Sequence, residues 1–222
     1  MAVSLPDDYA AAHYPNVWER MADRWVHIVA LAAFGAGSAA LIWIAAERGK
    51  PGLIVAAALY GAALIAMLAF SAAYNLSRAS RARPFLRRLD EAGIFLMIAG
   101  SYTPFTTQRL HGGWAIGMTA AVWTIAAFGI VGKIAFPRIS ERVWTGVYVL
   151  FGWVAVIALD PLRRSLPVES LLLLLAGGLV YTAGSLLFLN RRLPFRRAVW
   201  HSLVCVGAAL HFGAVLGGVF AG

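Results

Sequence analysis

Polar and ionisable side chains gather at the ends of long apolar stretches, where they could hold a metal, activate water or bind a polar ligand. Four groups share this placement: Asp23 with His27, Ser71 with Asn75, Asp90 with Glu91, and Arg197 with His201. A charged group inside a membrane helix is costly unless it is paired or faces a polar interior. These helix ends are therefore the first places to look for function.

Three of the four groups are spaced i,i+4, which puts both side chains on one face of a helix, one turn apart. Carboxylate, imidazole and hydroxyl groups can bind zinc, move protons or attack carbonyl carbons. Asn75 and His201 lie among apolar neighbours, whereas Asp23 and Glu91 are equally compatible with side chains that reach out to the interface. The spacing predicts a shared polar pocket where these helix ends meet.

The remaining histidines are less suited to that pocket. His211 lies ten residues after His201, about 15 Å further along a helix, and is expected to form a hydrogen bond between helices. His13 and His111 are expected in exposed loops.

The composition identifies the elements that must position these groups. The 222 residues are 61% hydrophobic and 13% charged, with a mean hydropathy of +0.75, which excludes a soluble domain. A single cysteine excludes a disulfide framework and a CxxC site. The first residues lack the pattern of a cleavable signal peptide, so the first membrane helix is expected to direct insertion.

Apolar stretches of the length that a bilayer requires, about 20 residues, occur seven times. They predict spans at 25–46, 53–74, 89–108, 114–136, 143–159, 171–189 and 198–220. The predicted fold is therefore an all-α integral membrane protein, a seven-transmembrane helix bundle. Residues 1–24 would form a polar cytoplasmic segment and residues 25–222 the membrane domain, with no room for a separate soluble domain.

Basic residues are distributed unevenly over the connections between these spans. Of the 19 Lys and Arg residues, 14 fall on the side of the N-terminus. The positive-inside rule then predicts a cytoplasmic N-terminus and an outside C-terminus. The basic rim would attract anionic lipid headgroups at about 1 kcal/mol per residue, and nucleic acid is not an expected partner.

Two other classes of seven-helix or pore-forming protein receive little support. A retinal protein needs a lysine in the last span for its Schiff base, and the only lysines are Lys50 and Lys133. A channel needs a regular row of polar residues along a span, and no predicted span has one, so a pore stays the weakest alternative.

Four segments together resemble the hemolysin III family, the bacterial branch of the progestin and adipoQ receptor group. They are ERMADRWVH (19–27), YGAALIAMLAFSAAYN (60–75), LRRLDEAGIFLMIAGSYTPF (86–105) and LPFRRAVWHSLVCVGAALHF (193–212). The resemblance covers the chain from the first span to the last. It implies a seven-helix bundle with a cytoplasmic N-terminus, related to intramembrane zinc hydrolases of lipid amides.

The resemblance also implies a zinc site with one histidine from the second span and two from the seventh, beside a serine and an aspartate. The serine corresponds to Ser71 and the aspartate to Asp90, which are the candidate catalytic residues. Asn75 and Arg197 stand at two of the three histidine positions, and His201 alone is kept. Asn is a poor zinc ligand, and the Arg guanidinium has no lone pair to donate.

The favoured interpretation is a protein of membrane and lipid homeostasis whose zinc-hydrolase site is degenerate and non-catalytic, with Arg197 paired to Asp90 where the metal would be. The alternative is a metal-dependent hydrolase of lipid amides with an altered ligand set, in which zinc binds through His201, Asp90 and His27. In that alternative, Asp90 or Ser71 would activate water, and His201 would hold a metal or act as a general base.

Overall fold

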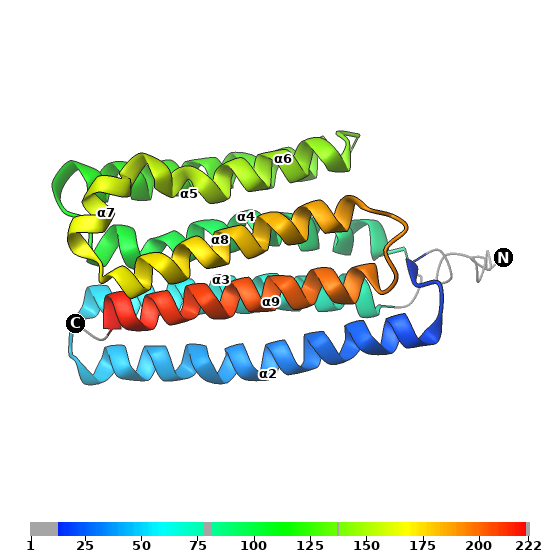
Figure 1. Ribbon diagram of the computed structural model, residues 1–222, viewed down its shortest axis with the longest axis horizontal. Coiled ribbons are helices and arrows are strands. Elements are labelled where there is room, and N and C mark those ends of the chain that lie inside the picture. Colours follow the sequence, from blue (N-terminus) through cyan, green and yellow to red (C-terminus); the bar gives the residue numbers. More distant parts are fainter. Residues whose placement is uncertain (1–12, 78–80, 137, 221–222) are drawn as a thin grey trace.

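A computed structural model describes residues 13–77, 81–136 and 138–220, and these residues are helical without any strand. The elements run in the order α2 Val17–Glu47, α3 Pro51–Leu76, α4 Arg83–Gln108, α5 Gly112–Ala135, α6 Glu141–Gly152, η1 Trp153–Ala158, α7 Leu159–Ser165, α8 Val168–Leu189, α9 Arg196–Val215 and η2 Leu216–Phe220. The long helices lie side by side along one axis, with the start of α2 and the end of η2 at opposite ends of the bundle (Figure 1). Part of the basic connection at 78–88 and residues 1–12 of the predicted N-terminal segment lie outside the described residues.

Local sequence signals set where the helices begin. The Asn16 side chain caps α2 by accepting a hydrogen bond from the backbone N–H of Glu19 at 3.0 Å, and Pro51 is the first residue of α3. Helix α2 therefore starts eight residues before the predicted span at 25–46, so the end of the segment 1–24 is already helical. This longer helix carries Asp23 on its second turn, inside the bundle.

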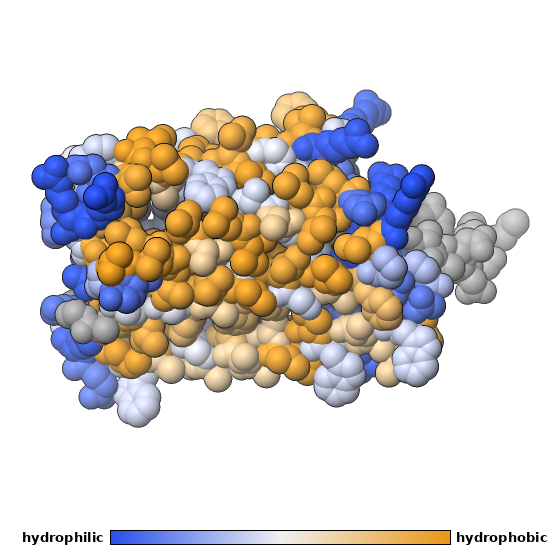
Figure 2. Space-filling view, in the orientation of Figure 1, coloured by the Kyte–Doolittle hydropathy of each residue, from blue (hydrophilic) through white to orange (hydrophobic). Residues whose placement is uncertain are grey.

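Within the described residues, six helical segments are long and apolar enough to cross a membrane. They are α2, α3, α5, the continuous stretch Glu141–Ser165, α8, and the stretch Arg196–Phe220. The space-filling view shows a broad apolar band between polar ends (Figure 2). The chain is thus an all-helical protein with several helices suited to spanning a membrane.

Helix α4 is the one long helix outside this set, although it matches the predicted span at 89–108. Its first turns carry charged residues and its last turns carry hydroxyl and amide groups, which lower its hydropathy. Its main neighbours are α3 and α5, and its buried polar groups include Thr103 and Thr106. A seventh span and the orientation of the termini stay predictions.

Each long helix packs against its sequence neighbour or closes the bundle. The main contacts join α2 to α3, α3 to α4, α4 to α5 and α8 to α9, and a further contact joins α9 back to α2. Glycine permits the closest approaches: a Cβ added at Gly177 of α8 would lie 2.3 Å from Cδ2 of His211 on α9. His211 donates its Nε2 hydrogen bond to the Leu174 carbonyl of α8, as the sequence predicts.

The fifth predicted span, 143–159, is interrupted where α6 gives way to η1. The Tyr102 hydroxyl of α4 forms hydrogen bonds with one carbonyl and one N–H group of the backbone at this break. It donates to the Gly152 carbonyl at 2.7 Å and accepts from the Ala155 N–H at 2.8 Å. Irregular backbone inside a membrane protein needs such internal partners. The break thus fixes α6 against α4 on one side of the cavity described below.

Candidate functional site

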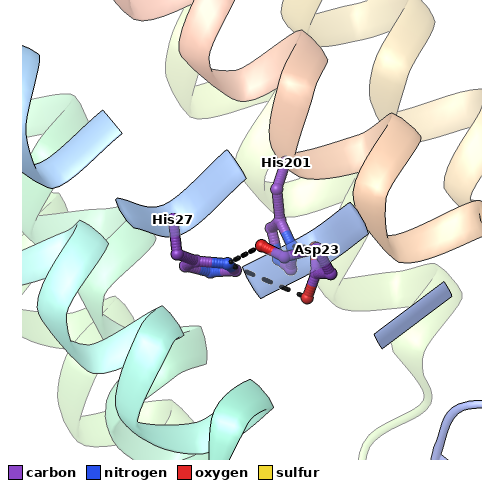
Figure 3. Close-up of side chains that lie close together, drawn as sticks. All are labelled: Asp23, His27 and His201. Atoms are coloured by element: carbon purple, nitrogen blue, oxygen red, sulfur yellow. Dashed lines mark hydrogen bonds and ion pairs between the residues drawn. The ribbon is translucent and has the colours of Figure 1, made fainter. Parts of the chain in front are cut away.

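Two helices, α2 and α9, bring Asp23, His27 and His201 together at the end of the bundle where α2 begins (Figure 3). The i,i+4 spacing of Asp23 and His27 lets His27 Nδ1 donate to the Asp23 backbone carbonyl at 2.8 Å. His201 on α9 donates from Nδ1 to Asp23 Oδ1 at 2.6 Å. Asp23 is 0% exposed, so these contacts form away from solvent. Asp23 therefore anchors both imidazole rings, one through its backbone and one through its carboxylate.

Ser71 of α3 lies at the centre of this group. Its Oγ is 3.2 Å from His27 Nε2 and 3.3 Å from His201 Nε2. Asn75, one turn later on α3, donates from Nδ2 to Ser71 Oγ at 3.2 Å. Because both Nδ1 atoms carry the ring hydrogens, both Nε2 atoms present lone pairs to one hydroxyl that has a single hydrogen to donate.

Arg197 and Asn75 contact each other directly. The guanidinium donates from Nη1 to Asn75 Oδ1 at 3.3 Å and from Nε to the His13 backbone carbonyl at 3.2 Å. His13 Nε2 donates to the same amide oxygen at 3.0 Å. The predicted pairing of Arg197 with Asp90 is not seen among the ion pairs of the described residues, because the guanidinium is held by these two acceptors instead.

The segment before α2 folds back onto the site, which corrects the prediction that His13 is an exposed loop residue. The Tyr14 hydroxyl donates to Asp23 Oδ2, and the ring of Tyr14 lies beneath the Arg197 guanidinium. Burial, together with the nearby Arg197, lowers the pKa of His13 from 6.5 to about 3. His13 is therefore neutral and acts as a hydrogen-bond donor. His111 is exposed, as predicted.

A second polar group lies at the start of α4. Glu91 Oε2 accepts a hydrogen bond from Lys133 Nζ of α5 at 2.7 Å, and Glu91 Oε1 accepts from Arg87 Nε at 2.9 Å. Asp90, the neighbour of Glu91, lines the same cavity as Ser71 and His201. The Asp90 carboxylate also accepts a hydrogen bond from Ser71, so Asp90 connects the two clusters. The structure thus gathers the predicted pocket residues at one end of the bundle in two clusters that meet at Asp90.

A cavity of about 450 Å³ lies between these clusters. Its polar wall includes the Ser71 hydroxyl and His201, and its cationic lining is Arg87, Lys133, Arg191, Arg196 and Arg197. Met67, Leu68, Ile94 and Val204 form an apolar wall. A second cavity of about 110 Å³, which is more apolar, shares Met67, Ile94 and Val204 with the first and continues toward the middle of the bundle. The two together suit an amphiphile with a charged head and an apolar chain.

Comparison with known proteins agrees with this architecture. The family model described as Haemolysin-III related matches residues 18–212. Hemolysin-3 of Bacillus cereus is 36% identical over 178 residues, covering 79% of this chain and 80% of that protein. The chain belongs to the hemolysin III family. A Hemolysin-3 homolog of Bacillus subtilis (strain 168) is 34% identical over 176 residues, covering 79% of this chain and 83% of that protein.

Relatives outside the bacterial hemolysin III proteins are more distant. The human Monocyte to macrophage differentiation factor is 25% identical over 207 residues, which covers 90% of this chain and 84% of that protein. No solved structure matches the chain significantly.

The zinc site that the hemolysin III resemblance implies does not fit the residues present. The positions expected to supply imidazole nitrogens hold Asn75 and Arg197, and a guanidinium nitrogen lies 3.3 Å from the carboxamide oxygen. A guanidinium offers only N–H donors and a fixed positive charge, which would repel a dication. A different set has suitable donor types: one ligand atom from each of Asp23, His27 and His201 lies within 4.8 Å of the others.

The sequence indicates most of these residues but not their partners. One hydrogen-bond network joins six of the residues whose helix-end positions predict a shared pocket. They are Asp23, His27, Ser71, Asn75, Arg197 and His201. The roles of His13, Tyr14 and Lys133 are missed, because each contact depends on how distant segments pack. The only signal for Tyr14 in the sequence is that a tyrosine, which can donate a hydrogen bond, lies nine residues before Asp23.

Proposed function

We propose that this hemolysin III protein binds an anionic lipid of the bacterial inner membrane in its cavity, with a cytoplasmic N-terminus, and has lost zinc hydrolysis at the family positions. The observation that carries the proposal is the 3.3 Å contact between Arg197 and Asn75. Arg197 and Asn75 correspond to two of the histidine positions that the family resemblance implies, and a guanidinium there, in contact with the carboxamide, supports the loss of a bound metal ion. The role is therefore one of membrane and lipid homeostasis through binding.

The chemistry of the cavity supports an anionic amphiphile. Five Lys and Arg side chains line the space and only three carboxylates do, which favours a negatively charged headgroup. The apolar wall continues into the second cavity through shared residues, which gives an acyl chain a path into the bundle. Arg197 lines the cavity and contacts Asn75, and it would bind phosphate oxygens through its remaining N–H groups.

Lipid binding by purified protein in a neutral detergent tests this proposal. Short-chain phosphatidylglycerol should raise the melting temperature more than phosphatidylcholine of the same chain length, and Arg197→Gln should remove that preference. Arg164→Gln is the matched control, because Arg164 is 78% exposed at the other end of the bundle. Equal stabilisation of wild-type protein by both lipids would contradict the proposal.

A second candidate, metal-dependent hydrolysis of lipid amides, rests on the grouping of Asp23, His27 and His201. Two imidazoles and one carboxylate are a ligand set that catalytic zinc uses. The test is release of fatty acid from a lipid amide by wild-type protein and by Asp90→Asn. Activity that a chelator removes and that Asp90→Asn lacks would support this candidate, and equal background rates would exclude it.

A further inference from the structure

Asp23, His201 and Ser71 are connected in the order that a serine hydrolase requires. The Asp23 carboxylate accepts from His201 Nδ1 at 2.6 Å, and the opposite ring nitrogen, Nε2, faces Ser71 Oγ at 3.3 Å. In such a triad the carboxylate fixes the tautomer of the imidazole and stabilises the imidazolium that forms. The three residues come from α2, α9 and α3, so only the folded bundle assembles them.

We propose that Ser71 is a nucleophile for metal-independent acyl transfer, with His201 as its general base and Asp23 as the positioning residue. The choice of substrate, an acyl ester of a lipid with an anionic headgroup, rests on the lipid binding proposed above. The assignment of the three residues does not. Ser71 is 7% exposed and lines the cavity, so its hydroxyl borders the space that a bound ester would fill. The hydroxyl and the imidazole need no metal to perform this chemistry.

His27 and Asp90 are the competing bases, since the Asp90 side chain is also hydrogen-bonded to Ser71. The contacts of His27 explain why His201 is favoured over it, and Asp90→Asn should slow the labelling described below less than His201→Gln. Both rings face Ser71 Oγ through Nε2, but His27 Nδ1 is held by a backbone carbonyl and lies 3.8 Å from the nearer Asp23 oxygen. His201 Nδ1 contacts the carboxylate directly. The charge that forms when the base takes the serine proton is therefore better compensated on His201.

The acyl-transfer step balances with these groups. Ser71 Oγ forms a bond to the ester carbonyl carbon while its proton moves to His201 Nε2. The Asn75 amide, which donates to Ser71 Oγ before the reaction, is the N–H donor that we assign to the developing oxyanion. The bond to the alcohol then breaks, and His201 returns the proton to the departing oxygen. Water cleaves the Ser71 ester by the same proton transfers and releases the fatty acid.

Labelling with a long-chain fluorophosphonate, in detergent with a chelator present, tests the nucleophile. We expect one covalent adduct on Ser71 in wild-type protein, located by peptide mass spectrometry, and none in Ser71→Ala. Ser165→Ala is the matched control, because Ser165 lies at the end of α7, at the other end of the bundle, and should leave the Ser71 adduct unchanged. Folded wild-type protein without a Ser71 adduct would overturn the proposal.

The rate of labelling separates a positioning role for Asp23 from a structural one. Asp23→Asn and His201→Gln should slow labelling by about 100-fold or more, and His27→Gln should slow it less. The final fraction of labelled protein should be unchanged in Asp23→Asn, since a misfolded variant would instead lose end-point labelling. Equal effects in His27→Gln and His201→Gln would overturn the assignment of the base.

Hydrolysis of 4-nitrophenyl decanoate provides the second measurement, with and without a chelator. We expect chelator-insensitive release of nitrophenol, lost in Ser71→Ala. Release that the chelator abolishes would show metal chemistry and overturn the triad. Wild-type protein that is preferentially stabilised by phosphatidylglycerol but releases no nitrophenol would retain lipid binding and lack acyl transfer, so the two failures are distinguishable.

Discussion

Two polar clusters face one cavity, and they stabilise their charged groups in different ways. Around Asp23, imidazole, hydroxyl and phenol groups form a closed hydrogen-bond network with a carboxylate that is 0% exposed. Around Glu91, the partners are the full cations Lys133 and Arg87, and the Glu91 and Arg87 side chains are 23% and 55% exposed. The group around Asp23 is thus a dry network suited to proton transfer. The group around Glu91 is a more exposed set of ion pairs that joins α4 to α5.

The largest effect is expected from removing the carboxylate of the dry network. Asp23→Ala leaves the Tyr14 hydroxyl and His201 Nδ1 without an acceptor in the bundle. Loss of one partner from a buried polar pair costs about 3–5 kcal/mol, so the free energy of unfolding in a denaturant titration should fall by that amount. Asp23→Asn keeps an acceptor oxygen and should lose less. A loss below about 1 kcal/mol in Asp23→Ala, the range of a surface pair, would contradict the described network.

A smaller, salt-dependent effect is expected at the second cluster. Glu91→Gln weakens the contacts to Lys133 and Arg87, and the free energy of unfolding should fall by about 1 kcal/mol at low salt. The difference from wild type should shrink at about 1 M salt, where the Debye length is roughly 3 Å. Asp160→Asn is the control, because its pair with Arg164 is more than two-thirds exposed at both residues. A salt-independent loss in Glu91→Gln would mean that the two clusters do not differ as described.

The smallest effect at neutral pH concerns the segment that covers the dry network, and it grows as the pH falls. The pKa of His13 is about 3 in the folded chain and 6.5 when the side chain is free, so the unfolded chain binds the proton more tightly. The free energy of unfolding should therefore fall as the pH drops from about 6.5 toward 3. Above pH 6.5 the contribution of neutral His13 should be present in full. The melting temperature of His13→Gln should depend less on pH than that of wild type. Identical pH profiles would show that His13 does not contribute.

Sequence patterns predict the parts of the site that lie within one helix. The i,i+4 pairs Asp23 with His27 and Ser71 with Asn75 need only helical periodicity, and both pairs do share a helix face. The apolar stretches likewise predict the helices, with their ends displaced by capping residues such as Asn16. Family membership follows from four short segments whose order the chain keeps.

Contacts between distant segments could not be predicted in the same way. Arg197 was expected to reach Asp90, but the fold-back of His13 and the position of Asn75 provide nearer acceptors. The depth of Asp23 was also open, because helix-end carboxylates often reach solvent. Its burial follows from α2 beginning at Val17 and packing against α3 and α9.

The metal content of the purified protein tests the central claim most directly, namely that Arg197 and Asn75 have replaced the family zinc site. Wild-type protein prepared with zinc in the medium should carry far less than one zinc per chain, and the double variant Asn75→His with Arg197→His should gain it. Stoichiometric zinc in the wild type, lost in His201→Ala, would contradict the account.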